Sequence, residues 1–167
     1  VGLNGFGRIG RNVLRAVATE PRIELVGIND VMEFEQMLYL GKYDTVMGRL
    51  DLELDDGALV MGDTAVPIHD EQDPAALPWS AEDVDVALEC TGVFRTRADA
   101  ARHLDAGAES VVISAPPKGE EFVKQIVYGV NHQEYDGERI VSNASCTTNS
   151  ITPVAKVLDE SFGIESG

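Results

Sequence analysis

The stretch NGFGRIGR (4–11) contains three glycines, Gly5, Gly7 and Gly10, in the spacing GxGxxG. It follows the apolar run VGLN (1–4), which predicts a strand, and it opens a segment whose apolar residues recur at helical spacing. Glycine at these positions lets the turn close tightly, lets the backbone approach a pyrophosphate and lets the helix pack against the strand. The amino end of that helix also presents free amides and a partial positive charge. Three glycines can simply solve a turn, but a strand before them and a helix after them favour a dinucleotide-binding fold.

The rest of the chain repeats this alternation of strand and helix. Short runs rich in valine and isoleucine alternate with segments of helical spacing, which is typical of βαβ units around a parallel sheet. Residues 49–68 differ, because strict alternation around the turn signal DDG (55–57) predicts a small antiparallel meander. Further strands are expected at 23–29, 84–90, 110–115, 125–130 and 139–144, and helices at about 33–40 and 97–106. The predicted fold class is α/β, a Rossmann-type, doubly wound, mostly parallel sheet with a small antiparallel insertion.

Composition places the chain among globular proteins. With 167 residues, 44% of them hydrophobic, it fits one domain that buries a real core. Two cysteines cannot form a disulfide framework, and the first residues lack the order of a signal peptide, so a reducing, cytoplasmic setting is expected. No apolar run approaches the roughly 20 residues that span a bilayer, so no membrane segment is expected.

The charge balance is strongly acidic. A formal net charge of -16, from 29 acidic and 13 basic residues, makes nucleic acid or an anionic membrane an unsuitable partner. The acidic residues are spread along the chain, so the charge belongs to the surface and not to a tail. Excess carboxylate with few lysines favours a protein kept soluble at high salt, as in a halophile, where screening weakens self-repulsion. An ordinary acidic surface is the alternative.

Polar residues stand at the ends of three predicted strands. Asp30 follows Gly10 by 20 positions, where a carboxylate accepts hydrogen bonds from the adenosine ribose and repels a 2′-phosphate, which favours NAD over NADP. The alternative is that Asp30 only caps the following helix. Thr91 and Ser114 end two later strands, where open α/β sheets bind their ligands, and are expected near the nicotinamide half. Taken alone, either residue also suits a turn or a cap.

The stretch SNASCTTNS (142–150) places Cys146 just ahead of an apolar helical stripe. A thiol in the first turn of a helix feels the helix dipole, which favours thiolate over thiol. Ser145 is the expected N-cap, and Pro153 predicts either a kink or a helix that becomes regular only later. The alternative is a buried structural cysteine, and position alone does not separate the two.

Several short motifs stand along the chain in a fixed order: NGFGRIGR, IND, YDTVMGR, DP followed by PW, ECTGVF, ISAPPKG, YGVN and SNASCTTN. In this order and at these intervals they resemble the NAD-binding half of the phosphorylating glyceraldehyde-3-phosphate dehydrogenase family. The resemblance covers the chain from Val1 to Gly167, but the proteins of that family are about twice as long. It implies an NAD-binding domain at 1–145 and a cysteine helix at 146–167 that starts a catalytic domain otherwise absent. We therefore expect an internal fragment of a longer, cytoplasmic, homotetrameric enzyme of glycolysis and gluconeogenesis.

The resemblance also implies roles for single residues. Cys146 matches the nucleophile that attacks the aldehyde of D-glyceraldehyde 3-phosphate to give a hemithioacetal. Hydride then passes to nicotinamide C4, and inorganic phosphate cleaves the resulting thioester to 1,3-bisphosphoglycerate, while the Cys146 amide stabilises an oxyanion. No metal is expected. The matching positions are Ser145 and Thr147 for phosphate, and Gly5, Gly7, Arg8, Ile9, Gly10, Asp30, Gln72, Thr91, Phe94 and Ser114 for NAD.

Two positions depart from the family pattern, and the catalytic base is not found. Gln72 stands where many relatives have a basic residue, which puts its contact to the adenosine side in doubt, and Ser150 replaces a second cysteine that many relatives carry. The loss of that cysteine removes any two-cysteine metal or disulfide interpretation. A thiol nucleophile needs a base, usually histidine, but each of the three histidines, His69, His103 and His132, is expected at the surface. The resemblance implies a base beyond Gly167, so no turnover and weak cofactor binding are expected from this chain by itself.

Two other functions fit parts of the pattern. Erythrose-4-phosphate dehydrogenase shares the cysteine motif, although ISAPPKGEE resembles the triose enzyme more closely. A non-catalytic dinucleotide-binding module that uses Cys146 as a redox switch is the second alternative. Comparing activity on the two sugars distinguishes erythrose-4-phosphate dehydrogenase from the triose enzyme. NAD binding without aldehyde oxidation identifies the binding module.

Overall fold

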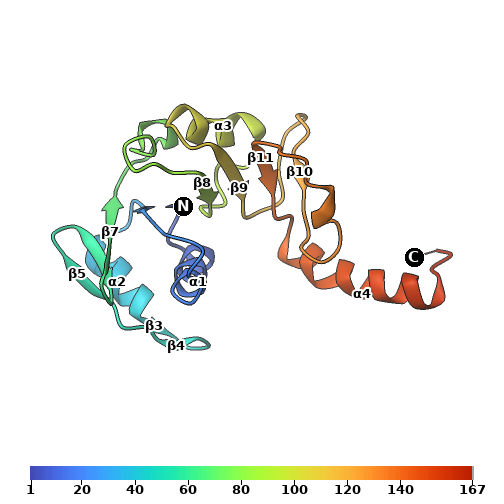
Figure 1. Cartoon of the computed structure of the whole chain (residues 1–167), viewed down its shortest axis with the longest axis horizontal. Helices are drawn as coiled ribbons and strands as arrows, with labels where there is room; N and C mark the ends of the chain where they lie inside the picture. Colours follow the sequence, from blue (N-terminus) through green and yellow to red (C-terminus); the bar gives the residue numbers. More distant parts are fainter. Residues whose placement is uncertain (167) are drawn as a thin grey trace.

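The computed structural model describes residues 1–166, which form a mixed nine-stranded sheet with helices (Figure 1). The order across the sheet is β10-β11-β9-β8-β1-β2-β7-β6-β5. Every neighbouring pair from β10 to β7 is parallel, whereas β7, β6 and β5 pair antiparallel. The strands are β1 Gly2–Asn4, β2 Gly27–Asn29, β5 Glu53–Asp55, β6 Ala58–Met61, β7 Thr64–His69, β8 Val86–Glu89, β9 Ser110–Ile113, β10 Lys124–Gln125 and β11 Ile140–Ser142, with a separate hairpin of β3 Tyr43–Asp44 and β4 Gly48–Arg49. The predicted α/β class, with its antiparallel insertion, is confirmed.

Strand β1 is the point where the strand order reverses. The chain goes from β1 to β2 in one direction and later from β8 to β9 in the other, so β1 and β8 are neighbours. Right-handed crossovers in opposite directions place their helices on opposite faces of a sheet. Figure 1 shows α1 and α3 on opposite sides, as this rule requires. The helices are α1 Arg8–Val17, α2 Phe34–Lys42, α3 Arg97–Asp105 and α4 Cys146–Phe162, with 3-10 turns η1 Pro74–Ala76 and η2 His132–Glu134.

Two apolar clusters fill the two faces of the sheet. Successive side chains of a strand point to opposite faces, and β8 shows this directly, since Ala87 belongs to one cluster and Leu88 packs against the other. The first cluster joins β1 and β2 to α1, α2 and the meander around Leu3, Phe6 and Met37. The second packs α3 against β8, β9 and β11 around Trp79, which is fully buried. The clusters fix the strand ends that form the site.

Several predicted boundaries differ from the observed ones. The strand expected at 23–29 is ordered only as Gly27–Asn29, and the one expected at 125–130 ends at Gln125. A turn ends it, because the Asn131 side chain accepts a hydrogen bond from the Val127 amide at 2.8 Å and Gly129 has a φ of 83°. A longer strand at 125–130 is therefore wrong.

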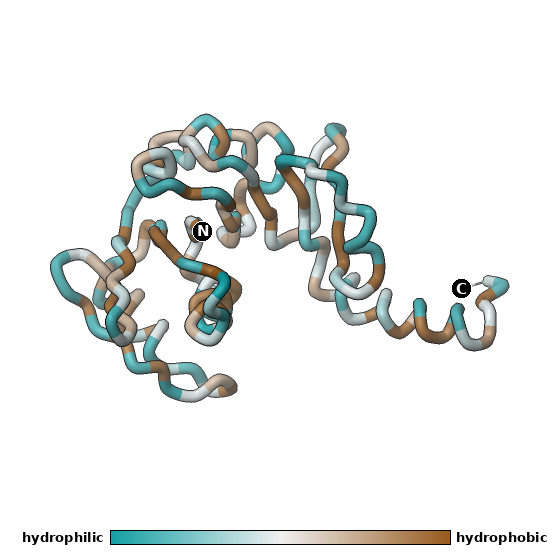
Figure 2. The backbone as a smooth tube through the Cα atoms, viewed as in Figure 1, coloured by the Kyte–Doolittle hydropathy of each residue, from teal (hydrophilic) through white to brown (hydrophobic). Residues whose placement is uncertain are grey.

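Helix α4 extends away from the sheet (Figure 1). It begins at Cys146 and continues through Pro153, so the expectation of a helix that becomes regular only later is wrong. None of its residues is buried, and apolar side chains such as Ile151 and Val154 are more than half exposed. Apolar positions recur along its length between polar ones (Figure 2). The predicted apolar stripe therefore exists, and it faces outward.

Candidate functional site

A cleft of about 310 Å³ opens where the strand order reverses. Asn4 is in register with both Asn29 and Glu89, so the carboxyl ends of β1, β2 and β8 lie side by side. In open α/β sheets this is where ligands bind. We call it the switch-point cleft; it is lined by Asn4, Gly5, Gly7, Asn29, Asp30, Val31, Glu71, Gln72, Cys90, Thr91, Val93 and Phe94.

The three glycines of the first loop meet three different steric demands. Gly5 has a φ of 98°, and a Cβ there would lie 2.6 Å from the backbone nitrogen of Thr91. A Cβ on Gly10 would lie 1.9 Å from the carbonyl oxygen of Gly5, so a side chain there would push α1 off the loop. A Cβ on Gly7 would meet no atom within 4 Å, and Gly7 lines the cleft. Gly5 and Gly10 shape the loop, and Gly7 leaves open the space that a ligand needs.

The amino end of α1 supplies donors for an anion. Gly7 is the N-cap and makes no side-chain cap, and the helical hydrogen bonds begin with the Arg11 amide, 3.1 Å from the Gly7 carbonyl. The amides of Arg8, Ile9 and Gly10 therefore precede the helical ladder. Free amides together with the helix dipole suit a pyrophosphate. The Arg8 and Ile9 side chains are both exposed beside it.

Asp30 ties the glycine loop to the end of β2. One carboxylate oxygen accepts from the Phe6 amide at 2.6 Å and the other from the Met32 amide at 3.0 Å. Its role as a cap of the following helix is wrong, because the N-cap of α2 is Glu33. A carboxylate has about four acceptor positions, so Asp30 keeps acceptors for ribose hydroxyls. Gln72 lies exposed on the same cleft.

Thr91 reaches the cleft but its hydroxyl is engaged in a turn. The hydroxyl donates to Glu89 and accepts from the Val93 amide at 3.0 Å, while the Thr91 amide donates to Glu89 at 2.8 Å. Phe94 lines the cleft and lies under the Arg102 guanidinium, 5.6 Å from its ring centre. Thr91 therefore presents its backbone and methyl group to a ligand.

A second, mostly apolar hollow of about 530 Å³ continues from the cleft along the sheet. Cys90 lines both, and Ile9, Ser114 and Asn143 line the hollow. Burial raises the pKa of the Cys90 thiol to about 11, despite a hydrogen bond with Ser114. Cys90 is therefore a packed thiol, while Ser114 stands where the far half of a dinucleotide would lie.

The turn from β11 into α4 presents the other cysteine. The buried Ser142 hydroxyl donates to the Ala115 carbonyl at 2.7 Å and accepts from the Ala144 amide at 2.9 Å. Ala144 has a φ of 57°, the left-handed region that non-glycine residues rarely adopt and that marks stored strain at functional sites. The Ser145 hydroxyl caps α4 by accepting from the Thr148 amide at 2.9 Å. Cys146 follows, exposed to solvent, so the buried-cysteine alternative is wrong.

The free amides at the start of α4 lie beside that thiol. The first helical hydrogen bond is donated by Asn149 to Ser145 at 2.9 Å. The amides of Cys146 and Thr147 therefore precede the ladder and suit a developing oxyanion or a phosphate. Thr147 is exposed, whereas the Ser145 hydroxyl accepts the capping bond and also lies 2.7 Å from the Thr148 hydroxyl.

The expected site residues follow one another along a single edge of the sheet. Asp30 follows β2, Gly5 follows β1, Thr91 follows β8, Ser114 follows β9 and Cys146 begins the helix after β11. The strands lie in that same order. Neighbouring strands are about 4.8 Å apart, so the four steps separate Asp30 from the thiol end by roughly 19 Å. An extended ligand bound along this edge runs from the carboxylate to the thiol.

The three histidines are all engaged away from Cys146. His69 pairs with Glu82 at 2.7 Å, and His132 accepts from the Gly129 amide at 3.0 Å. The surface expectation for His103 is wrong, because its side chain is fully buried on the inner face of α3. Within residues 1–166 none of these bonds places an imidazole on the thiol.

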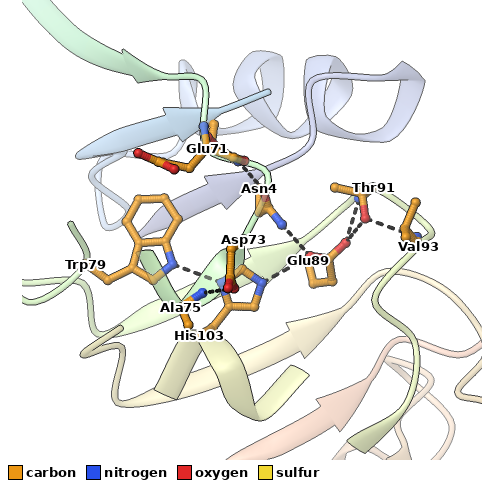
Figure 3. Close-up of polar contacts among 10 residues, drawn as sticks. Asn4, Glu71, Asp73, Ala75, Trp79, Glu89, Thr91, Val93 and His103 are labelled. Atoms are coloured by element: carbon orange, nitrogen blue, oxygen red, sulfur yellow. Dashed lines mark hydrogen bonds and ion pairs between the residues drawn. The ribbon is translucent and has the colours of Figure 1, made fainter. Parts of the chain in front are cut away.

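Three buried polar residues at the cleft were not predicted from the sequence. Asn4, Asn29 and Glu89 are the last residues of β1, β2 and β8, and all three are buried and hydrogen-bonded. Figure 3 shows the contact between Asn4 and Glu89. Buried polar groups need partners. A polar residue that ends each of three apolar runs was the available signal.

The larger groove on the molecule lies elsewhere and does not suit an anion. It measures about 1130 Å³ and follows α1 at the amino ends of the strands, near Val1, Val26 and Asp85. Its lining includes Arg22, which pairs with Glu20, and further carboxylates at Glu24, Glu82, Asp83 and Asp85, so the acidic groups outnumber that guanidinium and repel phosphates. Over the described residues, no cluster of three or more histidine, cysteine or acidic side chains is placed for a metal. No helix described is long and apolar enough to cross a membrane.

Known proteins resemble the chain over all of its length. Residues 1–97 match the family model of the glyceraldehyde 3-phosphate dehydrogenase NAD binding domain, and residues 145–167 match that of the C-terminal domain. The glyceraldehyde-3-phosphate dehydrogenase of Haloarcula vallismortis is 64% identical over 100% of this chain and 51% of its own length. Glyceraldehyde-3-phosphate dehydrogenase 1 of Bacillus subtilis is 47% identical, and the cytosolic enzyme of Leishmania mexicana 48%, each over 100% of this chain and 50% of the relative. The chain spans about half the length of the curated relatives it matches, and it belongs to the glyceraldehyde 3-phosphate dehydrogenase family.

Proposed function

We propose that the full-length protein containing this chain is an NAD-dependent, phosphorylating glyceraldehyde-3-phosphate dehydrogenase. The observation that carries the proposal is the exposed Cys146 at the amino end of α4, on the same sheet edge as the switch-point cleft. An exposed thiol at a helix start is suited to act as a nucleophile, unlike a packed one such as Cys90. The relatives named above support the choice of substrate.

The residues of the cleft fit NAD. The open space at Gly7 and the free amides that follow it suit the pyrophosphate, and the remaining acceptors of Asp30 suit the adenosine ribose. The carboxylate repels a 2′-phosphate, so NADP is the poorer ligand. The apolar hollow beside Ser114 suits the nicotinamide ring.

The chain's own residues perform the bond-forming steps at the thiol. The Cys146 thiolate adds to the aldehyde carbon of D-glyceraldehyde 3-phosphate, and the free amides of Cys146 and Thr147 stabilise the oxyanion of the hemithioacetal. NAD, when bound, supplies the acceptor for the hydride. The thioester left on Cys146 is reactive toward inorganic phosphate, which releases the acyl phosphate. We propose that Thr147, together with the backbone at Ser145, holds the phosphate that attacks.

The test is NADH formation by the full-length protein with D-glyceraldehyde 3-phosphate and phosphate. Cys146→Ser is expected to lower kcat by roughly a thousandfold or more, since the nucleophile is lost. Ser150→Ala, one turn later on the same helix, is the matched control and is expected to keep kcat. An equally active Cys146→Ser variant would refute the covalent mechanism. Comparable kcat/KM on erythrose 4-phosphate would instead favour the four-carbon sugar, and NAD binding without oxidation of either sugar would indicate a binding module.

We also infer a homo-oligomer located in the cytoplasm. Several large apolar side chains of α4 are exposed, and either the remaining half of the full-length chain or a second copy can cover them. The Leishmania mexicana relative is described as cytosolic. Light scattering on the full-length protein measures the assembly, and a monomeric mass would contradict it.

A further inference from the structure

Glu89 is a fully buried carboxylate behind the lining of the switch-point cleft, where it is hydrogen-bonded to Asn4, Thr91 and His103 (Figure 3). One oxygen accepts from the Asn4 side-chain amide at 2.6 Å and from Nε2 of His103 at 3.0 Å. The other accepts from the amide of Thr91 at 2.8 Å and from its hydroxyl. A buried carboxylate needs this many donors to offset its desolvation.

One end of the network fixes His103. The indole Nε1 of Trp79 lies 3.0 Å from Nδ1 of His103, and an indole nitrogen only donates. Nδ1 is therefore the acceptor, and the remaining ring proton is on Nε2, where it points to Glu89. His103 is thus a neutral donor to the carboxylate.

The other end of the network is fixed by backbone. The amide of Glu71 donates to Oδ1 of Asn29 at 2.8 Å, and Nδ2 of Asn29 donates to the Glu71 carbonyl at 2.9 Å. The second proton on that nitrogen goes to Oδ1 of Asn4 at 2.7 Å, which leaves the Asn4 amide nitrogen pointing at Glu89. Both ends of the network therefore require an acceptor at one oxygen of residue 89, and the Thr91 amide requires an acceptor at the other, which an ionised carboxylate supplies.

The network joins the two rims of the cleft. Thr91 begins the turn on one rim, and Glu71 precedes Gln72 on the other. Glu89 does not line the cleft, but it holds the first rim directly and the second through Asn4 and Asn29. We propose that Glu89 is the positioning residue of the dinucleotide cleft, holding its two rims at the spacing that binds NAD. This inference rests on the proposed function.

Glu89→Gln in the full-length protein tests the proposal, because an amide has one acceptor where the network needs two. Whichever way the new side chain turns, its nitrogen faces donors on one side. A donor left without an acceptor destabilises the arrangement of the two rims that binds NAD, by a factor of roughly five or more in its equilibrium constant. The Kd for NAD is therefore expected to rise about tenfold. We expect kcat at saturating NAD to change less than about threefold, since Cys146 lies two strands away. The matched control is Glu82→Gln, another largely buried carboxylate paired with a histidine, which does not line the cleft.

An unchanged Kd for NAD in folded Glu89→Gln would overturn the proposal, as would an equal change in Glu82→Gln. If Glu89→Gln does not fold, two His103 variants decide. Glutamine offers a donor nitrogen and an acceptor oxygen, as the imidazole offers a donor and an acceptor nitrogen, whereas leucine offers neither. His103→Gln is expected to keep NAD affinity closer to the unmodified protein than His103→Leu, and equal loss in both would overturn the proposal. Failure of the unmodified protein to bind NAD or oxidise the aldehyde would refute the proposed function instead.

Discussion

Gly5 and Gly7 stand two residues apart, and the structure predicts opposite results when each is changed to alanine. At Gly5 a Cβ would lie 2.6 Å from the Thr91 nitrogen and 2.7 Å from the Cys90 carbonyl carbon, at a φ of 98°. The backbone strain costs about 1–3 kcal/mol and the overlap about 1–3 kcal/mol more. Gly5→Ala is therefore expected to lower the free energy of unfolding by about 2–6 kcal/mol, a large part of a typical total of about 5–15 kcal/mol.

Gly7→Ala is expected to leave stability nearly unchanged and to weaken NAD binding. Its φ is −68° and a Cβ there meets no atom within 4 Å. Loss of a glycine N-cap and the stiffer unfolded chain act in opposite directions, so the change in the free energy of unfolding stays within about 1 kcal/mol. The new methyl group occupies ligand space and is expected to raise the Kd for NAD at least about tenfold.

Urea unfolding and calorimetric titration with NAD, both on the full-length protein, measure the two quantities. Unfolding curves with equal slopes make the midpoints comparable. Equal destabilisation of Gly7→Ala and Gly5→Ala would contradict the steric difference between the two sites. NAD binding by Gly7→Ala as tight as that of the unmodified protein would show that the open space at Gly7 does not hold the pyrophosphate.

Four further results are expected. Asp30→Asn should weaken NAD binding and reduce the preference for NAD over NADP, which the Kd values for the two cofactors measure. An unchanged ratio of the two Kd values would show that Asp30 does not determine which cofactor binds. Iodoacetamide at neutral pH should modify the exposed Cys146 and spare Cys90, which peptide mass spectrometry would detect. Early labelling of Cys90 would contradict its burial. Because the folded pKa of Cys90 is raised from 9.0 to about 11, only the unfolded chain loses that proton in this interval. The free energy of unfolding should thus fall between about pH 9 and 11, by up to roughly 2–3 kcal/mol, and Cys90→Ala should flatten the curve. With a net charge of -16, stability should rise from low to molar salt, and a sharp fall would refute the high-salt interpretation.

The sequence was sufficient for the fold class and for the glycine loop. Both depend on local patterns, namely the alternation of strand and helix and the GxGxxG spacing between them. Strand ends were less predictable, because the apolar run at 125–130 gives no sign that the Asn131 side chain closes a turn on it. Valine and isoleucine in that run favour a strand, but the turn closed by Asn131 determines where the strand ends.

Burial of polar residues could not be predicted in the same way. His103 has charged neighbours, but with Ala100 it occupies the three-residue spacing of the inner face of α3. The exposure of Cys146 depends on the turn between β11 and α4, where Ala144 adopts a left-handed backbone conformation. These outcomes depend on contacts between segments far apart in sequence.

The strand order of the central sheet also limits where the family can vary. One more strand between β1 and β11 would shift the thiol by about 4.8 Å along the edge, more than the roughly 3–3.5 Å at which reacting atoms meet. Additions beyond β2 move nothing that lies between the cleft and the thiol, and the antiparallel strands β5 and β6 lie on that side. Insertions and deletions should therefore accumulate in the segment from α2 to β7, whereas the number of strands from β1 to β11 should stay constant wherever the chemistry is kept.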